Sequence, residues 1–465
     1  MNGEMAVKFS RFLVLSLLVL ASCNDSGTPA PAVDPVVAGV VEKPLPPSGE
    51  WLSGDLHSHS TYSKDAFEQG GDGVGKVIEI SEAVGFDFLV ISDHRTLEQT
   101  RDENYSSDSM ILIPGEEWGT HGHAGAFGIE SEIPLVDWTQ PVETYDDQVQ
   151  AAIQTCLSHG GAWTINHPSR GKNPWIWSTE GASGVEVWNS FWTLVSEDAR
   201  VNEIDDFIAD GIDVNEAVLL SSQMSGVGGN RQGIVFWETL LNKGQRLAAV
   251  GGSDRHMVVL PGLPTTRVFA EESTQEGVIE AIKLGRTYIT YKPDGPVVQF
   301  EADGDGDGMF ETIVGGEVPH GTVSFRAQIT DSIGGKVQVI KNGTLFKSVP
   351  VSDGDIVEWS DEVTQGDWYR VEFCEKAETS DLSSIAWKEF VLSRPMQDID
   401  LESFEFYLKM VYLVASYQGL DLDFDYGTKL PTLLLRDDFL RLANIRLDDP
   451  QWAQAAMTSP IYAVK

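Results

Sequence analysis

The sequence is short of cysteine, of basic residues and of long apolar runs. Its three cysteines, Cys23, Cys156 and Cys374, are too few and too scattered along 465 residues to build a disulfide framework. Lysine and arginine together number 32, against 71 acidic residues, which gives a net charge of −39. Because so acidic a surface repels phosphates, we expect no nucleic-acid partner and no general affinity for anionic membranes.

What the sequence has in quantity is material for a folded core. Hydrophobic residues make up 42% of the chain, and 13 tryptophans are among them, which excludes global disorder. The length exceeds that of one ordinary domain, and the chain contains no internal repeat.

The first apolar run is typical of an export signal. Lys8 and Arg11 precede the apolar residues 12–21. This run is too short to span a bilayer, so we expect a signal peptide over residues 1–22.

Residues 20–23, Leu-Ala-Ser-Cys, resemble the lipobox of bacterial lipoproteins, in which the cysteine is lipidated. Asn24 favours the outer membrane over retention in the inner membrane. The proline-rich residues 23–50 are expected to form an extended tether. We therefore expect a protein of the bacterial cell envelope that contacts the membrane only through a lipid anchor at Cys23. A soluble secreted protein with an incidental cysteine is the alternative.

Residues 51–295 alternate short apolar runs with helix-like stretches, which predicts an α/β domain. The expected strands are residues 52–56, 86–91, 110–113, 124–129, 162–165, 185–188 and 247–250. The expected helices include residues 74–84, 146–158 and 274–284. About seven β/α repeats in a segment of this length match the size of a barrel. Residues 196–242 exceed one crossover, so we expect extra helices there.

Residues 296–465 change to a period-two pattern, which predicts a β-sandwich. The clearest of these runs are residues 323–329, 336–340 and 369–373. Residues 396–452 turn helical, with charged residues that exclude a membrane span. Because residues 459–464 again have the pattern of a strand, we expect the helices to be an insertion within the β-sandwich.

Eight of the nine histidines fall between His57 and His256. Histidine is the commonest metal ligand and proton carrier, so this clustering indicates a site. Histidine, aspartate or glutamate follows five expected strands, in residues 55–59, 92–94, 115–123, 166–168 and 251–256. Active sites of barrels gather at the C-terminal ends of strands. Nine such side chains, with a carboxylate able to bridge, predict two or three divalent cations.

The order and spacing of these segments resemble the polymerase-and-histidinol-phosphatase (PHP) family of metallohydrolases, and within it the branch named for carbaryl hydrolases. The resemblance covers Trp51 to Tyr291. Its motifs are DLHSHS, SDH, GEEW, GHAGAFG, NHP, GVEVWN, GGSDRH and GRTYIT. It implies a distorted (β/α)7 barrel with up to three metal ions, which could be zinc, manganese or iron, followed here by the β-sandwich with its helical insertion.

Transferred to this sequence, the ligand set of the family implies three metal sites, with Glu117 as a carboxylate that bridges the first and the second. The nine ligands, in the order of the first, second and third metal, are His57, His59, Glu117 and Asp254, then His123 and His167, then Asp65, His94 and His256. Glu116 competes with Glu117, but the Gly-x-Glu spacing of the family favours Glu117. Asp93 is expected to orient a ligand rather than to bind metal.

These metals imply a hydrolase in which a metal-bound hydroxide attacks the substrate, so no serine, cysteine or histidine nucleophile is needed. The leading interpretation is a phosphoesterase for small-molecule phosphomonoesters or phosphodiesters, with Arg170, Arg255 and Arg95 as candidates to bind the anion. Hydrolysis of a carbamate or a carboxylic ester at the same metals is the alternative. A third interpretation is a non-catalytic surface lipoprotein that binds metal or glycan.

An acidic segment stands apart from this set. Asp303, Asp305 and Asp307 resemble the start of a calcium-binding loop, but the twelfth position is Val314 instead of glutamate. A calcium ion and a simple acidic turn therefore both stay open.

Four other residues receive no ligand role. His121 and His159 are expected to be surface residues or to support a ligand. Glu186 lies at the end of an expected strand, where it either assists the site or packs. Cys156 lies in a helical stretch without a histidine partner, so it is not expected to be a nucleophile.

Overall fold

The computed structural model describes residues 48–68, 70–168, 174–189, 229–256, 261–376 and 452–464. The expected signal peptide, Cys23, Arg170 and residues 396–451 of the expected helical insertion lie outside these ranges. Among the described residues, no helix combines the length and the apolar character needed to cross a membrane. The lipid anchor and the helical insertion therefore stay predictions.

The strands expected in the α/β part are present, with bounds close to those expected. They are β1 (Glu50–Ser58), β2 (Phe88–Ile91), β3 (Ile111–Trp118), β4 (His123–Phe127), β5 (Ala162–Asn166), β6 (Gly184–Asn189) and β7 (Ala248–Gly252). Most of their residues are buried on both faces, which explains why the sequence shows continuous apolar runs here rather than alternation.

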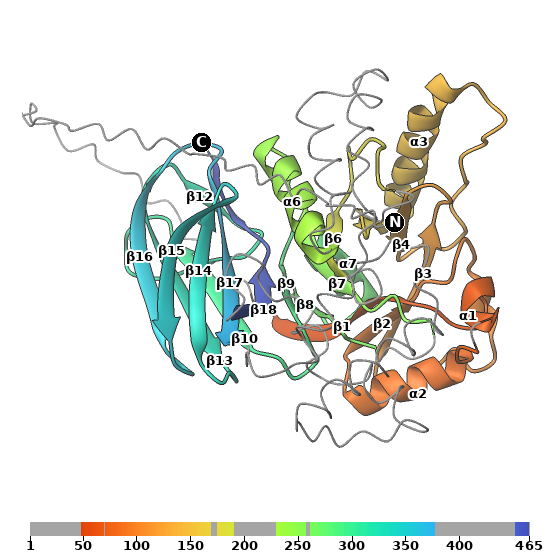
Figure 1. Ribbon diagram of the computed structural model, residues 1–465, viewed down its shortest axis with the longest axis horizontal. Coiled ribbons are helices and arrows are strands. Elements are labelled where there is room, and N and C mark those ends of the chain that lie inside the picture. The colour runs from red at the N-terminus through yellow and green to blue at the C-terminus, as the bar shows by residue number, and fades with distance from the viewer. Residues whose placement is uncertain are drawn as a thin grey trace, which may run out of the picture. The chain divides into compact units, whose positions relative to one another are not determined.

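The helices of this part lie around the strands (Figure 1). They are α1 (Lys64–Glu68), α2 (Val74–Val84), α3 (Tyr145–Ser158), α6 (Gly229–Asn242) and α7 (Gln275–Lys283), with short 3-10 turns η1 (Glu98–Arg101) and η2 (Val142–Thr144). In α2 the buried residues Val74, Val77, Ile78 and Ser81 recur at helical spacing. This helix ends at Gly85, whose φ of 87° lies in the left-handed region that favours glycine. α6 is the described part of the segment in which we expect extra helices.

Strands β1 to β7 follow one another in the sheet in chain order. The pairs β1–β2, β2–β3, β5–β6 and β6–β7 are parallel, whereas β4 runs antiparallel to both β3 and β5. In the described residues, an isolated bridge between Ser58 and Arg255 and a hydrogen bond of 2.8 Å from the Asp254 amide to the His57 carbonyl connect β7 with β1. A closed barrel ladder is therefore not seen in this part of the chain, and the reversed β4 departs from a uniform β/α repeat.

The sheet continues past the domain boundary expected at residue 295. β8 (Thr265–Ala270) pairs antiparallel with β1 and with β9 (Thr287–Thr290), and β9 pairs with β18 (Trp452–Thr458). The remaining strands of this sheet are β12 (Glu317–Pro319), β14 (Gly335–Lys341), β15 (Thr344–Val351), β17 (Trp368–Lys376) and β19 (Ile461–Val464). Within the described residues this sheet has 15 strands, so the metal-ligand strands and the C-terminal strands share one hydrogen-bonded network.

A second sheet packs on the C-terminal strands. It has the order β11 (Thr312–Ile313), β10 (Val297–Asp303), β13 (Gly321–Thr330) and β16 (Ile356–Val363). The rings of Phe300, Phe325 and Trp359 stack on this sheet, and Phe325 contacts Tyr369 of β17 at 4.5 Å between centroids. The expected period-two strands therefore lie in two sheets with an aromatic contact between them, and their arrangement as a β-sandwich stays a prediction.

A buried ion pair joins helix α6 to strand β17. The Arg370 guanidinium is 2% exposed, and its Nη2 lies 2.5 Å from Glu238 Oε1 on α6 and 2.6 Å from Glu372 Oε1. Because both carboxylates share one buried cation, we expect this contact to hold α6 against the C-terminal strands.

Replacing Arg370 with methionine should lower the free energy of unfolding by about 3–5 kcal/mol, because it removes the buried cation that Glu238 and Glu372 share. The matched control is Arg101→Met, which removes an exposed pair with Glu98 and should cost less than about 1 kcal/mol. Urea unfolding followed by tryptophan fluorescence measures both. Equal stabilities of the two variants would contradict the role given to Arg370.

Candidate metal centre

The strand directions bring the expected ligands to one edge of the sheet. β1, β2 and β3 run parallel, so their C-terminal ends meet there. β4 runs the other way, which places its first residue, His123, at the same edge, opposite Asn166 of β5. The side chains gathered there are His57, His59, His94, Glu117, His123, His167, Asp254 and His256.

Four of these side chains converge on one point. His57, His59, Glu117 and Asp254 are buried, and each offers one ligand atom within 4.8 Å of the others. The two histidine Nε2 atoms are 3.2 Å apart, and Asp254 Oδ1 lies 3.3 and 3.1 Å from them. Glu117 Oε1 is 3.3 Å from His57 Nε2, and its Oε2 is 3.5 Å from His59 Nε2. Tetrahedral ligands at about 2.1 Å from a cation are roughly 3.4 Å apart, so this spacing fits one divalent ion.

Glu117 also reaches the neighbouring histidines through both of its oxygen atoms. Oε1 lies 2.9 Å from His123 Nδ1 and 2.9 Å from His167 Nε2. Oε2 lies 2.9 Å from His94 Nδ1, yet neither of these two atoms makes a hydrogen bond of suitable geometry within the part of the chain that the structure describes. Buried ligand atoms that converge without hydrogen bonding suit a cation between them. The carboxylate is therefore placed to bridge two metals.

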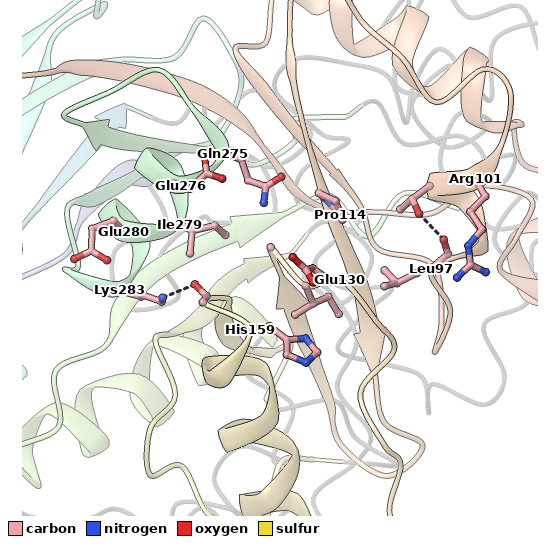
Figure 2. Close-up of a pocket in the computed structure, with 14 residues that line it drawn as sticks. Leu97, Arg101, Pro114, Glu130, His159, Gln275, Glu276, Ile279, Glu280 and Lys283 are labelled. Atoms are coloured by element: carbon pink, nitrogen blue, oxygen red, sulfur yellow. Dashed lines mark hydrogen bonds between the residues drawn. The ribbon is translucent and has the colours of Figure 1, made fainter.

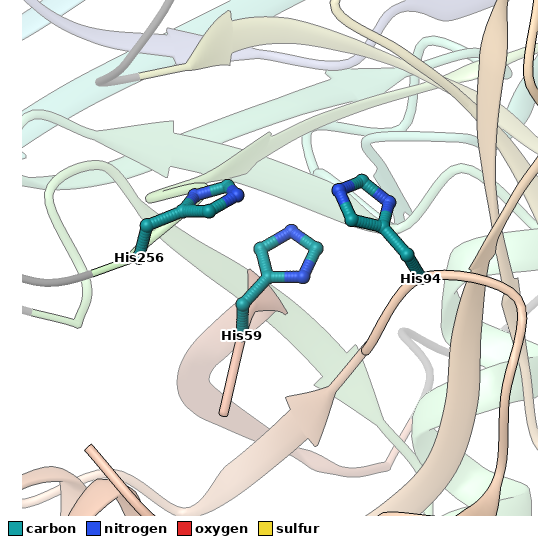
Figure 3. A group of neighbouring side chains, drawn as sticks. All are labelled: His59, His94 and His256. Carbon is teal, nitrogen blue, oxygen red and sulfur yellow. The ribbon is translucent and has the colours of Figure 1, made fainter. Parts of the chain in front are cut away.

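A third group forms around Asp65. Its Oδ2 is 3.0 Å from His94 Nε2 and 3.3 Å from His256 Nε2. The rings of His59, His94 and His256 turn toward a common space, with the centroid of His59 at 4.6 Å from His94 and 4.3 Å from His256 (Figure 3).

The structure thus brings all nine expected ligands together, but it groups some of them differently from the family pattern. His59 lies with His94 and His256, in addition to its place in the first group, and His94 lies with Glu117 and His123. Because the groups share ligands, the number of ions and the division of ligands among them stay predictions.

Glu186 of β6 belongs to this site, although the sequence leaves its role undecided. Its Oε1 lies 2.9 Å from His57 Nδ1, while its Oε2 accepts the backbone N–H of His167 at 2.8 Å and the amide of Asn189 at 3.0 Å. A carboxylate at Nδ1 keeps the proton there and leaves the Nε2 lone pair for a metal. The signal available in the sequence was the position of Glu186 near the end of an apolar strand.

Asp93 orients His59 through Ser63. The Ser63 hydroxyl donates to Asp93 Oδ1 at 2.7 Å, so its oxygen can only accept from His59 Nδ1, which lies 2.8 Å away. The proton of His59 is therefore on Nδ1, and Nε2 faces the cluster. Asp93 also accepts from the backbone N–H and the hydroxyl of Ser60. Its contact with the expected ligand His59 is therefore indirect, and the orienting role expected for Asp93 stays a prediction.

The arginines expected to bind an anion have different surroundings. Arg255 is buried and pairs with Asp72 through Nη2, while Nε and Nη1 find no hydrogen-bond partner in the described part of the chain. Arg95 is exposed and donates from Nη1 to the Gly119 carbonyl at 3.1 Å. Arg170 lies outside the described residues.

Glu116 points away from the cluster, as the choice of Glu117 requires. It accepts the Ile133 N–H at 2.7 Å, and burial raises the pKa of its carboxyl to about 7. Alternation along β3 places the two neighbouring glutamates on opposite faces.

The acidic segment after β10 forms a separate group. Asp303, Asp305 and Asp307 each offer an oxygen within 4.8 Å of the others, together with Glu311, which the sequence interpretation did not include. Asp303 accepts the backbone N–H groups of Gly306 and Gly308. These bonds make an acidic turn, and a calcium ion there stays a prediction.

The backbone is strained at the metal centre. His167 and Asp254 have φ values of 26° and 51°, and Arg95, next to His94, has a φ of 55°. Such conformations cost about 1–3 kcal/mol each and persist where the surroundings determine them. Two expected ligands are therefore held in position by the fold itself.

Charge coupling sets the protonation of the histidines. Burial and the nearby imidazoles of His256 and His94 lower the pKa of His59 to about 3, so this ring is neutral. Burial alone would also lower the pKa of His94, but the carboxylates of Glu117 and Asp65 raise it to about 10. The imidazoles of His123, His57 and His94 hold the pKa of Glu117 well below its usual range despite its burial. A cation entering the cluster must therefore displace protons.

A cavity of about 430 Å³ lies apart from the cluster, between α7 and the turn that follows α3 (Figure 2). Charged side chains of both signs line it, among them Arg101, Glu130, Glu280 and Lys283, whose amine donates to the Gly160 carbonyl. None of the nine expected ligands lines this cavity, so we assign it no part in the metal chemistry.

We expect that metal binding by the cluster requires a glycine at position 252 of β7. An added Cβ would lie 2.3 Å from His57 Cβ and 2.5 Å from Glu186 Oε1, so Gly252→Ala must displace one of them. We expect metal affinity to fall by at least about 10-fold, as is typical when the support of a ligand is lost. Metal content per chain, measured by mass spectrometry after dialysis, checks this. Gly73→Ala is the control, since its nearest neighbour is 3.9 Å away. Equal metal contents would count against the geometry.

Zinc binding to the metal-free chain should release protons at pH 7, because His94, with a pKa of about 10, must lose its proton to bind. The apparent affinity should rise with pH, by about tenfold per unit for each proton displaced. Calorimetry in two buffers of different ionisation enthalpy measures the number of protons. His320→Gln, which alters an exposed histidine outside the cluster, should leave that number unchanged. An affinity that is the same at pH 6 and pH 8 would refute the prediction.

No protein-family model matches the chain, and no curated protein matches it either. Among solved structures, the chain is similar to a two-domain protein from Bacteroides vulgatus that contains a predicted PHP-like metal-dependent phosphoesterase. The identity is 14% and the TM-score 0.34, over 72% of this chain and 95% of that one. It is also similar to PsfC from Pseudomonas syringae, with 13% identity and a TM-score of 0.29, over 50% of this chain and 87% of that one. At these scores the likeness does not assign the chain to a family.

Proposed function

We propose that this chain is a metal-dependent hydrolase of the PHP type that cleaves phosphomonoesters or phosphodiesters of small molecules. The observation that carries the proposal is the convergence of His57, His59, Glu117 and Asp254, with ligand atoms 3.1–3.5 Å apart. Burying these groups is costly unless they bind a cation. Imidazole with carboxylate suits zinc, manganese or iron.

We also propose that strands β1 to β7 of this chain form the distorted barrel that the resemblance to the PHP family implies. Strands β1 to β7 follow one another in the sheet, and the Ser58–Arg255 bridge brings the end of β7 beside β1. These contacts support a distorted barrel whose last seam is formed by single contacts instead of a ladder.

Divalent cations held in the cluster would lower the pKa of a coordinated water toward neutrality and offset the negative charge that develops on the ester group. The residues of the chain prepare the ligands for this. Glu186 and Ser63 accept the Nδ1 protons of His57 and His59, which turns both Nε2 atoms toward the same point. The Asp254 carbonyl lies 2.9 Å from Nδ1 of His256 and orients that ring toward Asp65.

Arg255 supports the choice of a phosphate ester. Its guanidinium is buried, and two of its nitrogen atoms have no hydrogen-bond partner in the described residues. In the sequence, Arg255 stands between the expected ligands Asp254 and His256. A buried cation with unused donors on this segment suits the binding of a substrate oxyanion.

The full chain, purified in detergent and loaded with Mn²⁺ or Zn²⁺, should hydrolyse p-nitrophenyl phosphate. Asp254→Ala should lower kcat/KM by more than about 100-fold, because it removes a ligand that two histidines share. Asp353→Ala, an exposed aspartate of the β-sheet part, should leave the rate unchanged. The absorbance of released nitrophenolate measures the rate of hydrolysis by the unchanged chain and by the two variants.

Other outcomes separate the alternatives. Bound metal with turnover of aryl carbamates or carboxylic esters alone would replace the phosphoesterase by the ester hydrolase. Bound metal without turnover of any ester would favour a non-catalytic metal-binding lipoprotein. A chain that binds no divalent metal would overturn the proposal itself.

A further inference from the structure

Two indole rings hold the loop that links β3 to β4. This loop, residues 119–122, begins two residues after Glu117 and ends just before His123. The indole N–H of Trp138 donates to Thr120 Oγ1 at 3.0 Å, and that of Trp177 donates to the His121 carbonyl at 2.6 Å. The loop between two expected metal ligands is therefore fixed by aromatic side chains.

These side chains form a continuous aromatic group. Trp138 lies 4.6 Å from His121 and 5.8 Å from Trp177 between centroids, and Tyr145 packs edge-on to Trp138 at 4.7 Å. His121 is exposed, and Trp138 and Trp177 are only half-buried. Part of each ring surface is therefore open among the described residues, unlike the buried Trp175 beside them.

A second segment connects the aromatic group with the metal centre. The backbone N–H of Trp175 donates to the Pro168 carbonyl at 2.9 Å, and Pro168 directly follows the expected ligand His167. A Cβ on Gly122 would lie 3.2 Å from both Trp175 and Trp177, so the glycine lets the loop rest on the indoles. The loop thus leads directly into His123, and the backbone of Trp175, two residues before Trp177, is hydrogen-bonded to the residue after His167.

We propose that His121, Trp138 and Trp177 form an aromatic shelf that binds a flat ring in the leaving group of the substrate while the metal cluster binds its ester group. The inference rests on the proposed function and narrows its substrate class to aryl or similarly flat-ringed esters. Aromatic faces prefer stacked or edge-on partners. A purely structural role of the indoles would instead affect all substrates alike, through the position of His123.

The test measures binding, so it does not require turnover. Phenylphosphonate and propylphosphonate share the anionic group and differ in the flat ring. Calorimetry with the Mn²⁺-loaded full chain should show that phenylphosphonate binds more tightly. Trp177→Leu and Trp138→Leu should each lower the affinity for phenylphosphonate by about 3- to 10-fold and the affinity for propylphosphonate by less than about 2-fold. Trp177→Phe, which keeps a ring but loses the indole N–H, should retain most of the preference.

Ile176→Ala is the matched control, because Ile176 is 46% exposed and lies directly beside Trp177 in the chain. It should change neither affinity. If the tryptophan variants lost affinity for both phosphonates equally, the proposed aromatic shelf would be wrong and the tryptophans would have a structural role only. Absence of phenylphosphonate binding to the Mn²⁺-loaded chain would overturn it too. A phenyl preference without turnover of any phosphoester would retain the shelf and reject the phosphoesterase, so the two failures are distinguishable.

Discussion

The interaction on which the rest of the structure depends is that of one buried carboxylate with five imidazoles. Glu117 is 1% exposed, and nitrogen atoms of His57, His59, His94, His123 and His167 lie 2.9–3.5 Å from its two oxygens. A charge removed from water this completely is stable only with fixed partners. Those partners come from the ends of four strands, β1, β2, β4 and β5, which explains why β1 to β5 must meet at one edge and why β4 must run in reverse to present its first residue.

Behind these ligands, a second set of polar groups fixes their orientation. Asp55 accepts the backbone N–H groups of His57, Ser253 and Gly262, so one carboxylate aligns β1 with the segments that follow β7. Burial raises the pKa of this carboxyl despite these hydrogen bonds. Together with Glu186 and Asp93, it shows that buried acids hold three of the expected ligands, His57, His59 and His167. These three ligands lie at the ends of strands β1 and β5.

The sequence allowed the local elements to be predicted, because they depend on short-range patterns. The nine expected ligands came from the family resemblance; the structure brings their side chains together, and their binding of metal stays a prediction. Helix α2 has the expected bounds, since its buried face recurs at helical spacing and a glycine ends it. The reversed direction of β4 was not predicted, because apolar runs carry no sign of strand direction. The role of Glu186 and the addition of Glu311 to the acidic segment also depend on contacts between distant residues. Periodicity gives no information on such contacts, nor on the sheet that continues through β9 and β18.

That continuous sheet has a consequence for how the chain is made. Ser459 accepts the Ala249 N–H at 2.8 Å and contacts Thr287 at 2.6 Å, so residues 452–464 complete the strands next to the metal centre. These residues leave the ribosome after all the other described ones. Until then, β9 lacks its partner β18, and contacts across more than 160 residues of sequence make closure slow. The sheet next to the metal centre therefore cannot be completed before residues 452–464 have been synthesised, although the strands that carry the expected ligands are made much earlier.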